Sequence, residues 1–185
     1  DLTNDGEIRA EHVQGGSASA RTYGIWLTQG TIWPSGNSVI NNGTISADVA
    51  IRFFGDASGD SLSNFNFTLT NNGTISGEVW FGNGTDTYST VGGRTDGIVF
   101  AYGGNDVLTG GSFADWFEGG AGDDTLDGRD GIDRALYTGT SAAVTVDLRI
   151  AGAQNTGGAG NDTLIGIEGL VGSRFDDALY GNSGD

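Results

Sequence analysis

The sequence predicts an all-β protein, folded as a right-handed parallel β-solenoid in which wider β-helix coils pass into a narrower roll. Three observations predict this fold class: 35 glycines among 185 residues, a hexapeptide that occurs twice, and a series of aspartates at nearly even spacing. A high glycine content and a net charge of −16 are also typical of disordered segments. Because 36% of the residues are hydrophobic and the glycines are periodic, we expect an ordered repeat protein instead.

The first half of the chain, residues 1–93, contains the hexapeptide repeat. Its sequence, NNGTIS, occurs at 41–46 and again at 71–76, and a weaker copy begins at Asn4. Asn-Gly pairs favour turns, and the run after each strong copy is rich in the β-branched and aromatic residues that favour strands. We therefore expect coils of about 30 residues with several short strands each. The pattern resembles the right-handed β-helices of bacterial adhesins and polysaccharide-acting proteins.

The second half, residues 94–185, has a shorter period, and the first aspartate of this period, Asp86, already lies just before this half. Six aspartates are each followed, two residues later, by a residue that we expect to point inward. The pairs are Asp86 and Tyr88, Asp96 and Ile98, Asp106 and Leu108, Asp115 and Phe117, Asp124 and Leu126, and Asp133 and Ala135. The clearest unit, GGAGDDTLD at 119–127, matches the nonapeptide pattern G-G-x-G-x-D-x-U-x at every specified position.

Each nonapeptide predicts a glycine turn of about six residues followed by a strand of about three. Two such units close a coil of about 18 residues, so Asp106 would lie over Asp124 and Asp115 over Asp133. Two carboxylates about 5 Å apart repel by about 3 kcal/mol at an effective dielectric constant near 20. A hard cation removes this repulsion, and Ca²⁺ prefers the carboxylate and backbone carbonyl oxygens that such turns expose. The stacked aspartates therefore predict an array of calcium sites.

The candidate ligands are the aspartates together with the glycines and polar residues of their turns. They are Gly104, Asn105, Asp106, Asp115, Gly120, Gly122, Asp123, Asp124, Gly131, Asp133, Gly160, Asp162, Asp177, Asp86 and Asp96. The pattern departs from the nonapeptide at Phe113, Ala114 and Ile132. The gap between Asp133 and Asp162 is much longer than one nonapeptide, which predicts an interruption of the coils around 137–157.

The segment 101–137 resembles the repeats-in-toxin (RTX) family, the hemolysin-type calcium-binding β-roll of secreted bacterial proteins. The resemblance returns at 157–164, which reads GGAGNDTL, and at 172–182. It implies a β-roll that binds Ca²⁺ through its glycine turns and aspartates.

The composition excludes several other functions. The chain has no Cys, so it can form neither a disulfide nor a thiolate metal site. A net charge of −16 argues against binding to nucleic acid, and no apolar run approaches the roughly 18 residues of a membrane span. With His12 as the one histidine and no Lys, the sequence offers no catalytic constellation, and we expect no enzymatic activity.

These observations predict a non-catalytic, calcium-binding β-solenoid module, cut from a longer bacterial protein that leaves the cell by type I secretion. It would fold on Ca²⁺ after export and serve as a structural or adhesive unit outside the cell or at its surface. Two alternatives remain: part of a carbohydrate-active enzyme of the alginate epimerase or polysaccharide lyase type, or a self-assembling filament or surface-layer subunit. Extracellular polysaccharide and identical subunits are therefore candidate partners. Trp80 and Trp116 could stack on carbohydrate, but aromatic stacks in the core explain them as well or better.

Overall fold

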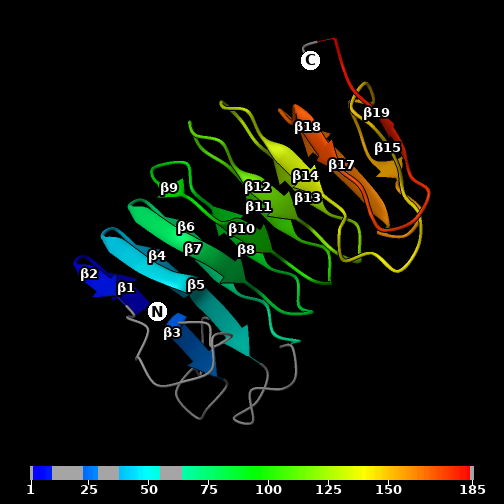
Figure 1. The fold of residues 1–185 in the computed structure, drawn as a ribbon. Helices are drawn as coiled ribbons and strands as arrows, with labels where there is room; N and C mark the ends of the chain where they lie inside the picture. Colours follow the sequence, from blue (N-terminus) through cyan, green and yellow to red (C-terminus); the bar gives the residue numbers. More distant parts are fainter. Residues whose placement is uncertain (1, 10–22, 29–37, 55–63, 184–185) are drawn as a thin grey trace.

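The computed structural model of the protein describes residues 2–9, 23–28, 38–54 and 64–183, so His12 lies outside the described residues. Within these ranges every regular element is a β-strand, which confirms the all-β prediction for this part of the chain. The same ranges contain no helix that could cross a lipid bilayer. The strands form two long sheets joined by turns at both edges (Figure 1).

The first sheet contains parallel strands in the order β1-β4-β6-β8-β11-β13-β17, with β16 antiparallel at its end. Its strands are β1 (Leu2–Asn4), β4 (Ser38–Asn41), β6 (Thr68–Asn71), β8 (Thr87–Ser89), β11 (Val107–Thr109), β13 (Thr125–Asp127), β17 (Asn161–Ile165) and β16 (Gln154–Asn155). Most of these strands have one buried apolar residue between two hydroxyl or β-branched residues, a pattern that suits a half-buried strand.

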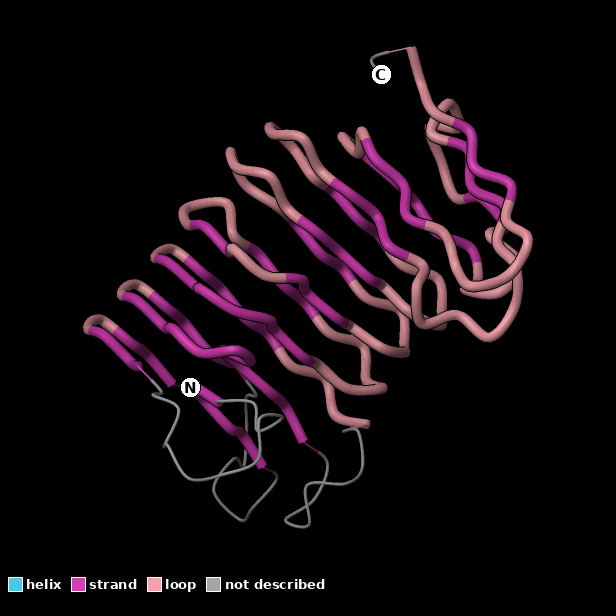
Figure 2. Tube along the Cα trace, viewed as in Figure 1, coloured by secondary structure: helices cyan, strands magenta, loops and turns pink. Residues whose placement is uncertain are grey.

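The second sheet has the order β18-β14-β12-β10-β7-β5-β2, while β3 also pairs with β5 and β9 with β7. Its strands are β2 (Glu7–Arg9), β3 (Tyr23–Thr28), β5 (Thr44–Phe54), β7 (Thr74–Trp80), β9 (Arg94–Thr95), β10 (Ile98–Phe100), β12 (Trp116–Glu118), β14 (Arg134–Leu136) and β18 (Gly169–Val171). All these pairings are parallel, so the chain returns to the same sheet once per coil, as expected of a β-solenoid (Figure 2).

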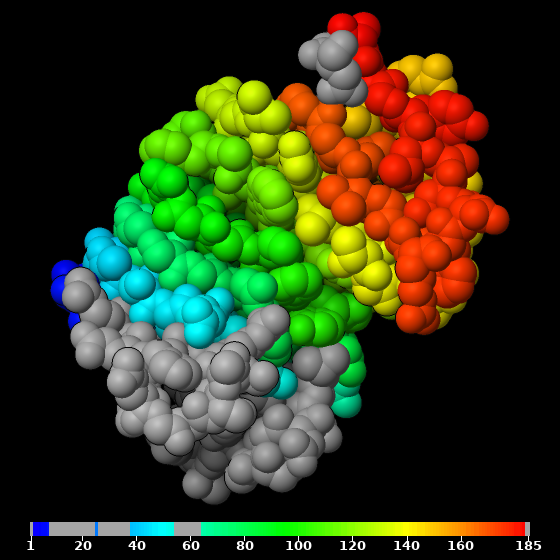
Figure 3. Space-filling model, in the orientation of Figure 1, coloured from blue at the N-terminus to red at the C-terminus, as the bar shows by residue number. Residues whose placement is uncertain are grey.

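The coils become shorter from Asn41 to Asp124. Stacked positions are 30 residues apart at Asn41 and Asn71, 20 apart at Asp86 and Asp106, and 18 apart at Asp106 and Asp124. The last of these separations confirms the predicted coil of two nonapeptide units. In the space-filling view the colours follow one another in bands from cyan to red, because successive coils lie side by side (Figure 3).

The core lies between the two sheets and is filled by the inward residue of each strand. Tyr88, Leu108, Phe117, Leu126 and Ala135 are all buried, as predicted from their place two residues after an aspartate. The prediction is wrong for Ile98. Val99 fills that core position instead and pairs with Phe117, because this unit carries one additional residue between its aspartate and its strand.

The hexapeptide copies lie in register, one above the other. Asn4, Asn41 and Asn71 form a buried ladder in which the Asn4 Nδ2 donates to Asn41 Oδ1 at 2.8 Å, and the Asn41 Nδ2 donates to Asn71 Oδ1 at 2.7 Å. The glycines that follow these asparagines form the corners between the two sheets. Successive corners are stacked, because the Thr74 N–H donates to the Gly43 carbonyl of the preceding coil at 2.8 Å. The predicted role of Asn-Gly as a corner is therefore confirmed.

Between β14 and β17 the chain leaves the stack, in the region of the predicted interruption. This excursion contains β15 (Thr145–Asp147) and β16, and β16 covers the outer edge of β17. The last strand, β19 (Ala178–Tyr180), pairs with β15 rather than with β17. The final repeat therefore stacks on the excursion and not on the main roll.

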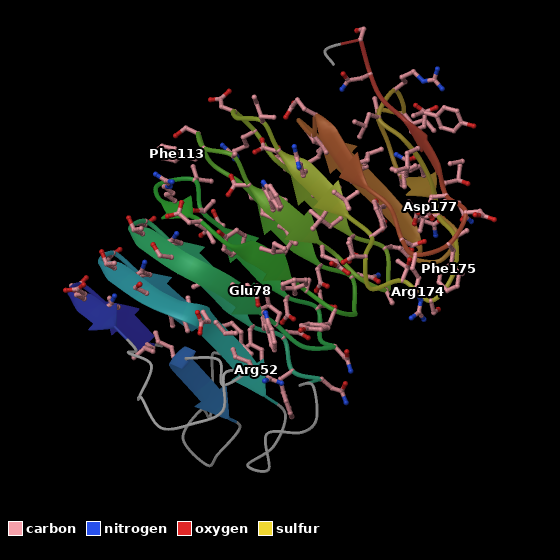
Figure 4. The ribbon with its side chains drawn as sticks, viewed as in Figure 1. Arg52, Glu78, Phe113, Arg174, Phe175 and Asp177 are labelled. Carbon is pink, nitrogen blue, oxygen red and sulfur yellow. The ribbon has the colours of Figure 1, made fainter. Side chains whose placement is uncertain are left out.

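Trp80 and Trp116 lie on the outer face of the second sheet, so their interpretation as core residues is wrong. Val79 and Phe117 are the inward residues of these strands, and side chains alternate along a strand. Trp116 is 39% exposed. The guanidinium of Arg52 lies 4.7 Å from the ring centroid of Trp80, and Figure 4 shows Arg52 near Glu78 of the neighbouring strand.

Candidate metal centre

The first turn row consists of the turns that lead into the first sheet, at 81–86, 101–106, 119–124 and 157–162. Each ends in an aspartate that is at most 1% exposed. The aspartates are Asp86, Asp106, Asp124 and Asp162. They form a ladder: the Asp86 N–H donates to Asp106 Oδ1 at 2.7 Å, and the Asp106 N–H donates to Asp124 Oδ1 at 2.9 Å. The Asp124 N–H donates to Asp162 Oδ1 at 3.2 Å. The predicted stacking of Asp106 over Asp124 is confirmed.

The second carboxylate oxygen of the two central aspartates is buried without a hydrogen-bond partner. These atoms are Asp106 Oδ2 and Asp124 Oδ2. The pKa of Asp106 is raised to about 8, mainly because the carboxyl group is buried. The hydrogen bond from the Asp86 N–H lowers this pKa, and the nearby carboxylate of Asp124 raises it. Burial likewise raises the pKa of Asp124 to about 7. A buried anionic oxygen without a donor requires either a proton or a cation.

Glycine keeps the space beside Asp124 Oδ2 open. A Cβ at Gly119 would lie 2.3 Å from Asp124 Oδ2, and a Cβ at Gly122 would lie 1.8 Å from the Gly104 carbonyl oxygen. Gly122 also has φ +140°, a conformation that other residues rarely adopt. The carbonyl oxygen of Gly122 approaches Gly160 of the next coil in the same way. Glycine is therefore required in these turns both beside a carboxylate oxygen and beside a backbone carbonyl oxygen of the neighbouring coil.

The donor set fits a calcium ion. Within the described ranges, no three acidic, histidine or cysteine side chains converge as a metal-binding group. Ca²⁺ binds six to eight oxygens and accepts backbone carbonyls among them, so carbonyl oxygens of the glycine turns would complete each site. Gly104, Gly120, Gly131 and Gly160 share the positive φ of Gly122, which supports their predicted place in these turns.

A second polar ladder runs beside the aspartates on the exposed side of the first turn row. The Asp123 N–H donates to Asn105 Oδ1 at 3.0 Å, and the Asn161 N–H donates to Asp123 Oδ1 at 2.9 Å. Asn105 and Asp123, both predicted as ligands, therefore lie in neighbouring coils of one row.

The second turn row leads into the second sheet and comprises 110–115, 128–133 and 166–168. The Asp115 N–H donates to Asp133 Oδ1 at 2.7 Å, which confirms their predicted stacking, and Asp133 Oδ2 is again buried without a partner. Here the glycine pattern is broken by exposed apolar side chains, because Phe113 is 48% and Ile132 is 68% exposed. Figure 4 shows Phe113 at this edge of the molecule.

Glu168 continues the second turn row and was not identified from the sequence. Its Oε2 accepts from the Asp133 N–H at 2.8 Å, in the place that the next stacked aspartate would take. Glu168 precedes Leu170 by two residues, and Leu170 pairs with Ala135. This spacing, which is the same as that of each aspartate and its inward residue, could have identified it.

Two predicted ligands lie outside both rows. Asp96 is exposed and pairs with Arg94, since Gly97 displaces it from the buried position. Asp177 lies in the C-terminal unit, near Arg174 and Phe175 in Figure 4. Its Oδ1 accepts from the Val144 N–H at 2.8 Å, and this bond together with those from Ser173 lowers the pKa of Asp177.

Comparison with known proteins agrees with this geometry. The family model described as RTX calcium-binding nonapeptide repeat (four copies) matches residues 100–135, 156–169 and 170–185. No curated protein and no solved structure matches the chain. The first of the three segments contains the ladder aspartates Asp106 and Asp124, and the second contains Asp162. The C-terminal region of this chain therefore carries RTX calcium-binding nonapeptide repeats.

Proposed function

We propose that this chain is a non-catalytic structural module whose RTX region folds around Ca²⁺ bound along the first turn row. The observation that carries the proposal is the pair of buried, unpartnered oxygens Asp106 Oδ2 and Asp124 Oδ2. Each lies in a turn whose glycines bring backbone carbonyls close by. Bound Ca²⁺ would supply the positive charge that these carboxylates lack.

Calcium binding would be coupled to folding. The ladder exists only when successive coils are stacked, because each aspartate accepts a hydrogen bond from the coil before it. An unfolded chain therefore has no such site, and the free energy of binding contributes to the free energy of folding. Without the cation, the buried carboxylates disfavour stacking.

We further propose that the module works outside a bacterial cell. RTX repeats are found in secreted proteins. Extracellular calcium modules bind with Kd values of about 10⁻⁴–10⁻³ M, so such sites would be empty in the cytosol and filled after export. The net charge of −16 would keep the unfolded chain soluble through self-repulsion before the ion binds.

A calcium titration of the full chain tests the proposal. Far-UV circular dichroism and protease resistance would report folding, and sedimentation would report assembly, with Mg²⁺ at equal concentration as the control. We expect a folding midpoint of about 10⁻⁴–10⁻³ M Ca²⁺ and much less structure with Mg²⁺. Unchanged circular dichroism and protease resistance after chelation with EDTA would overturn calcium-coupled folding. A sub-micromolar midpoint would contradict folding after export.

A further inference from the structure

The outer face of the second sheet contains a pocket beside the first turn row. Gly120 and Gly158 of that row line part of it, but none of the ladder aspartates does. The volume of the pocket is about 380 Å³, within the range of small-molecule sites. The excursion loop at 138–141 forms one wall. The other walls are formed by β10, β12, the turns that follow them, and Gly158 in the turn before β17. The larger side chains in its lining include Phe100, Tyr102, Glu118 and Thr138.

Glu118 is a fixed acceptor in this pocket. It is 6% exposed, and its carboxylate accepts from Thr138 Oγ1 and from the Gly139 N–H, both at 2.6 Å. A Cβ at Gly139 would lie 2.6 Å from Glu118 Oε1, so the close approach of the loop requires this glycine. A carboxylate has about four acceptor sites, and two donors leave capacity for hydroxyl groups of a ligand.

Aromatic rings form the apolar part of the pocket. The ring centroids of Phe100 and Tyr102 are 6.0 Å apart, with the planes inclined by 33°. Trp80 packs edge-on against both rings, at 6.2 Å and 6.3 Å. Packing of this kind holds the rings in place, and rigid aromatic faces beside a fixed acceptor suit a ligand with both apolar and hydroxylated sides.

Tyr102 occupies the position at which the nonapeptide pattern has its second glycine. The bridge between Gly103 and Ala121 places Tyr102 in register with Gly120, which has φ +100°. Tyr102 has φ +68°, a strained conformation for a bulky residue. A residue that opposes the local backbone preference indicates that its side chain serves another purpose.

We propose that this pocket binds a neutral saccharide, which is a function beyond calcium binding. The apolar face of a sugar ring would stack on Phe100 and Tyr102, and its hydroxyl groups would donate to Glu118. None of the described lining residues carries a positive charge, and the chain has a net charge of −16, so an anionic sugar would be repelled. Each Glu118 oxygen already accepts one hydrogen bond, so hydroxyl donors fit the acceptor positions that remain, whereas a quaternary ammonium ion has no O–H or N–H to donate to them.

Substitution of Tyr102 by glycine separates binding from folding. Tyr102→Gly removes the ring with its contacts to Trp80 and Phe100, but it also restores the residue type that the backbone prefers. Because the second effect offsets the first, calcium-dependent folding should be retained. Arg129→Gly is the matched control, because Arg129 has φ +66° at the equivalent place in the second turn row. The probes are the glucose hexamers cellohexaose, laminarihexaose and maltohexaose, the N-acetylglucosamine hexamer, an oligoguluronate of equal length and tetramethylammonium.

Binding would be measured by titration calorimetry and saturation-transfer NMR on the calcium-saturated full chain. We expect at least one neutral hexamer to bind, with a loss of about tenfold or more in Tyr102→Gly and no change in Arg129→Gly. Absence of binding by all four neutral hexamers, equal binding by Tyr102→Gly, or preferential binding of oligoguluronate or tetramethylammonium would overturn the proposal. Circular dichroism of the same samples reports calcium-dependent folding separately.

Discussion

The Asp106 N–H donates to Asp124 Oδ1 at 2.9 Å, while Asp124 Oδ2 is buried with no hydrogen-bond partner. One carboxylate therefore has two roles. One oxygen joins successive coils through the backbone, and the other contributes an uncompensated negative charge to the turn. This division explains how a ladder of acidic side chains can both define the stacking of coils and make that stacking depend on a cation.

The charge and the hydrogen bond of Asp124 can be separated by substitution. In Asp124→Asn the Oδ1 can still accept from the Asp106 N–H, but the negative charge is lost. We expect the calcium midpoint to rise by about tenfold, equivalent to about 1.4 kcal/mol, and the metal-free fold to become more stable. Calcium titration and urea denaturation in EDTA would measure the two effects.

Asp96→Asn is the matched control for this substitution. Asp96 is exposed and pairs with Arg94, and surface pairs of this kind contribute little. We expect neither its calcium midpoint nor its metal-free stability to change measurably. Equal effects of the two substitutions would show that burial in the ladder does not determine calcium affinity.

Gly122 should be among the least replaceable residues of the roll. In Gly122→Ala the new Cβ would lie 1.8 Å from the Gly104 carbonyl oxygen, at φ +140°. We expect a loss of more than about 2 kcal/mol in the free energy of unfolding with calcium bound, because both the close approach and the backbone conformation require glycine.

Gly152→Ala provides the comparison, since a Cβ at Gly152 would meet no atom within 4 Å. Its free energy of unfolding should change by less than about 0.5 kcal/mol. Urea denaturation of both variants in calcium measures the difference. Similar stability of the two would show that adjacent coils can separate enough to admit a side chain at Gly122.

The periodic part of the fold could be predicted from the sequence, since the spacing of Asp106 and Asp124 alone determines the length of the coil that joins them. Asp96 was misplaced because a single additional residue, Gly97, reverses which side chains point inward. The pairing of β15 with β19 was not predictable in this way, because it depends on contacts between distant segments rather than on the local period. For the same reason, the closure of the excursion loop over Glu118 was missed.

Without calcium, the roll should become more stable as the pH falls from 8 to 5. Burial raises the pKa of Asp106 to about 8, of Asp124 to about 7, and of Asp86 and Asp133 to about 6. A raised pKa means that the folded state binds the proton more tightly than the unfolded chain does. The stabilisation is therefore complete below the ordinary pKa of about 4 and is lost as the pH rises through 6–8.

Circular dichroism and urea denaturation in a metal-free buffer series would measure this dependence. With saturating calcium the dependence should reverse, because protons then compete with the cation for the same oxygens. A decrease of metal-free stability between pH 8 and pH 5 would contradict the role of these carboxylates.

The second turn row should gain a calcium site when its pattern is repaired. Phe113 and Ile132 take the places of Gly122 and Asp123 in the nonapeptide, although Asp133 Oδ2 is buried there without a partner and a Cβ at Gly128 would lie 2.4 Å from it. We expect the double substitution Phe113→Gly and Ile132→Asp to add one bound ion, because it restores the flexible turn and supplies an oxygen ligand. Both side chains are exposed, so their removal should cost the core little. Equilibrium dialysis with elemental analysis would compare the bound calcium of this variant and the parent chain. If both chains bound the same number of calcium ions, the glycine and acidic positions of the nonapeptide would not explain the difference between the two turn rows.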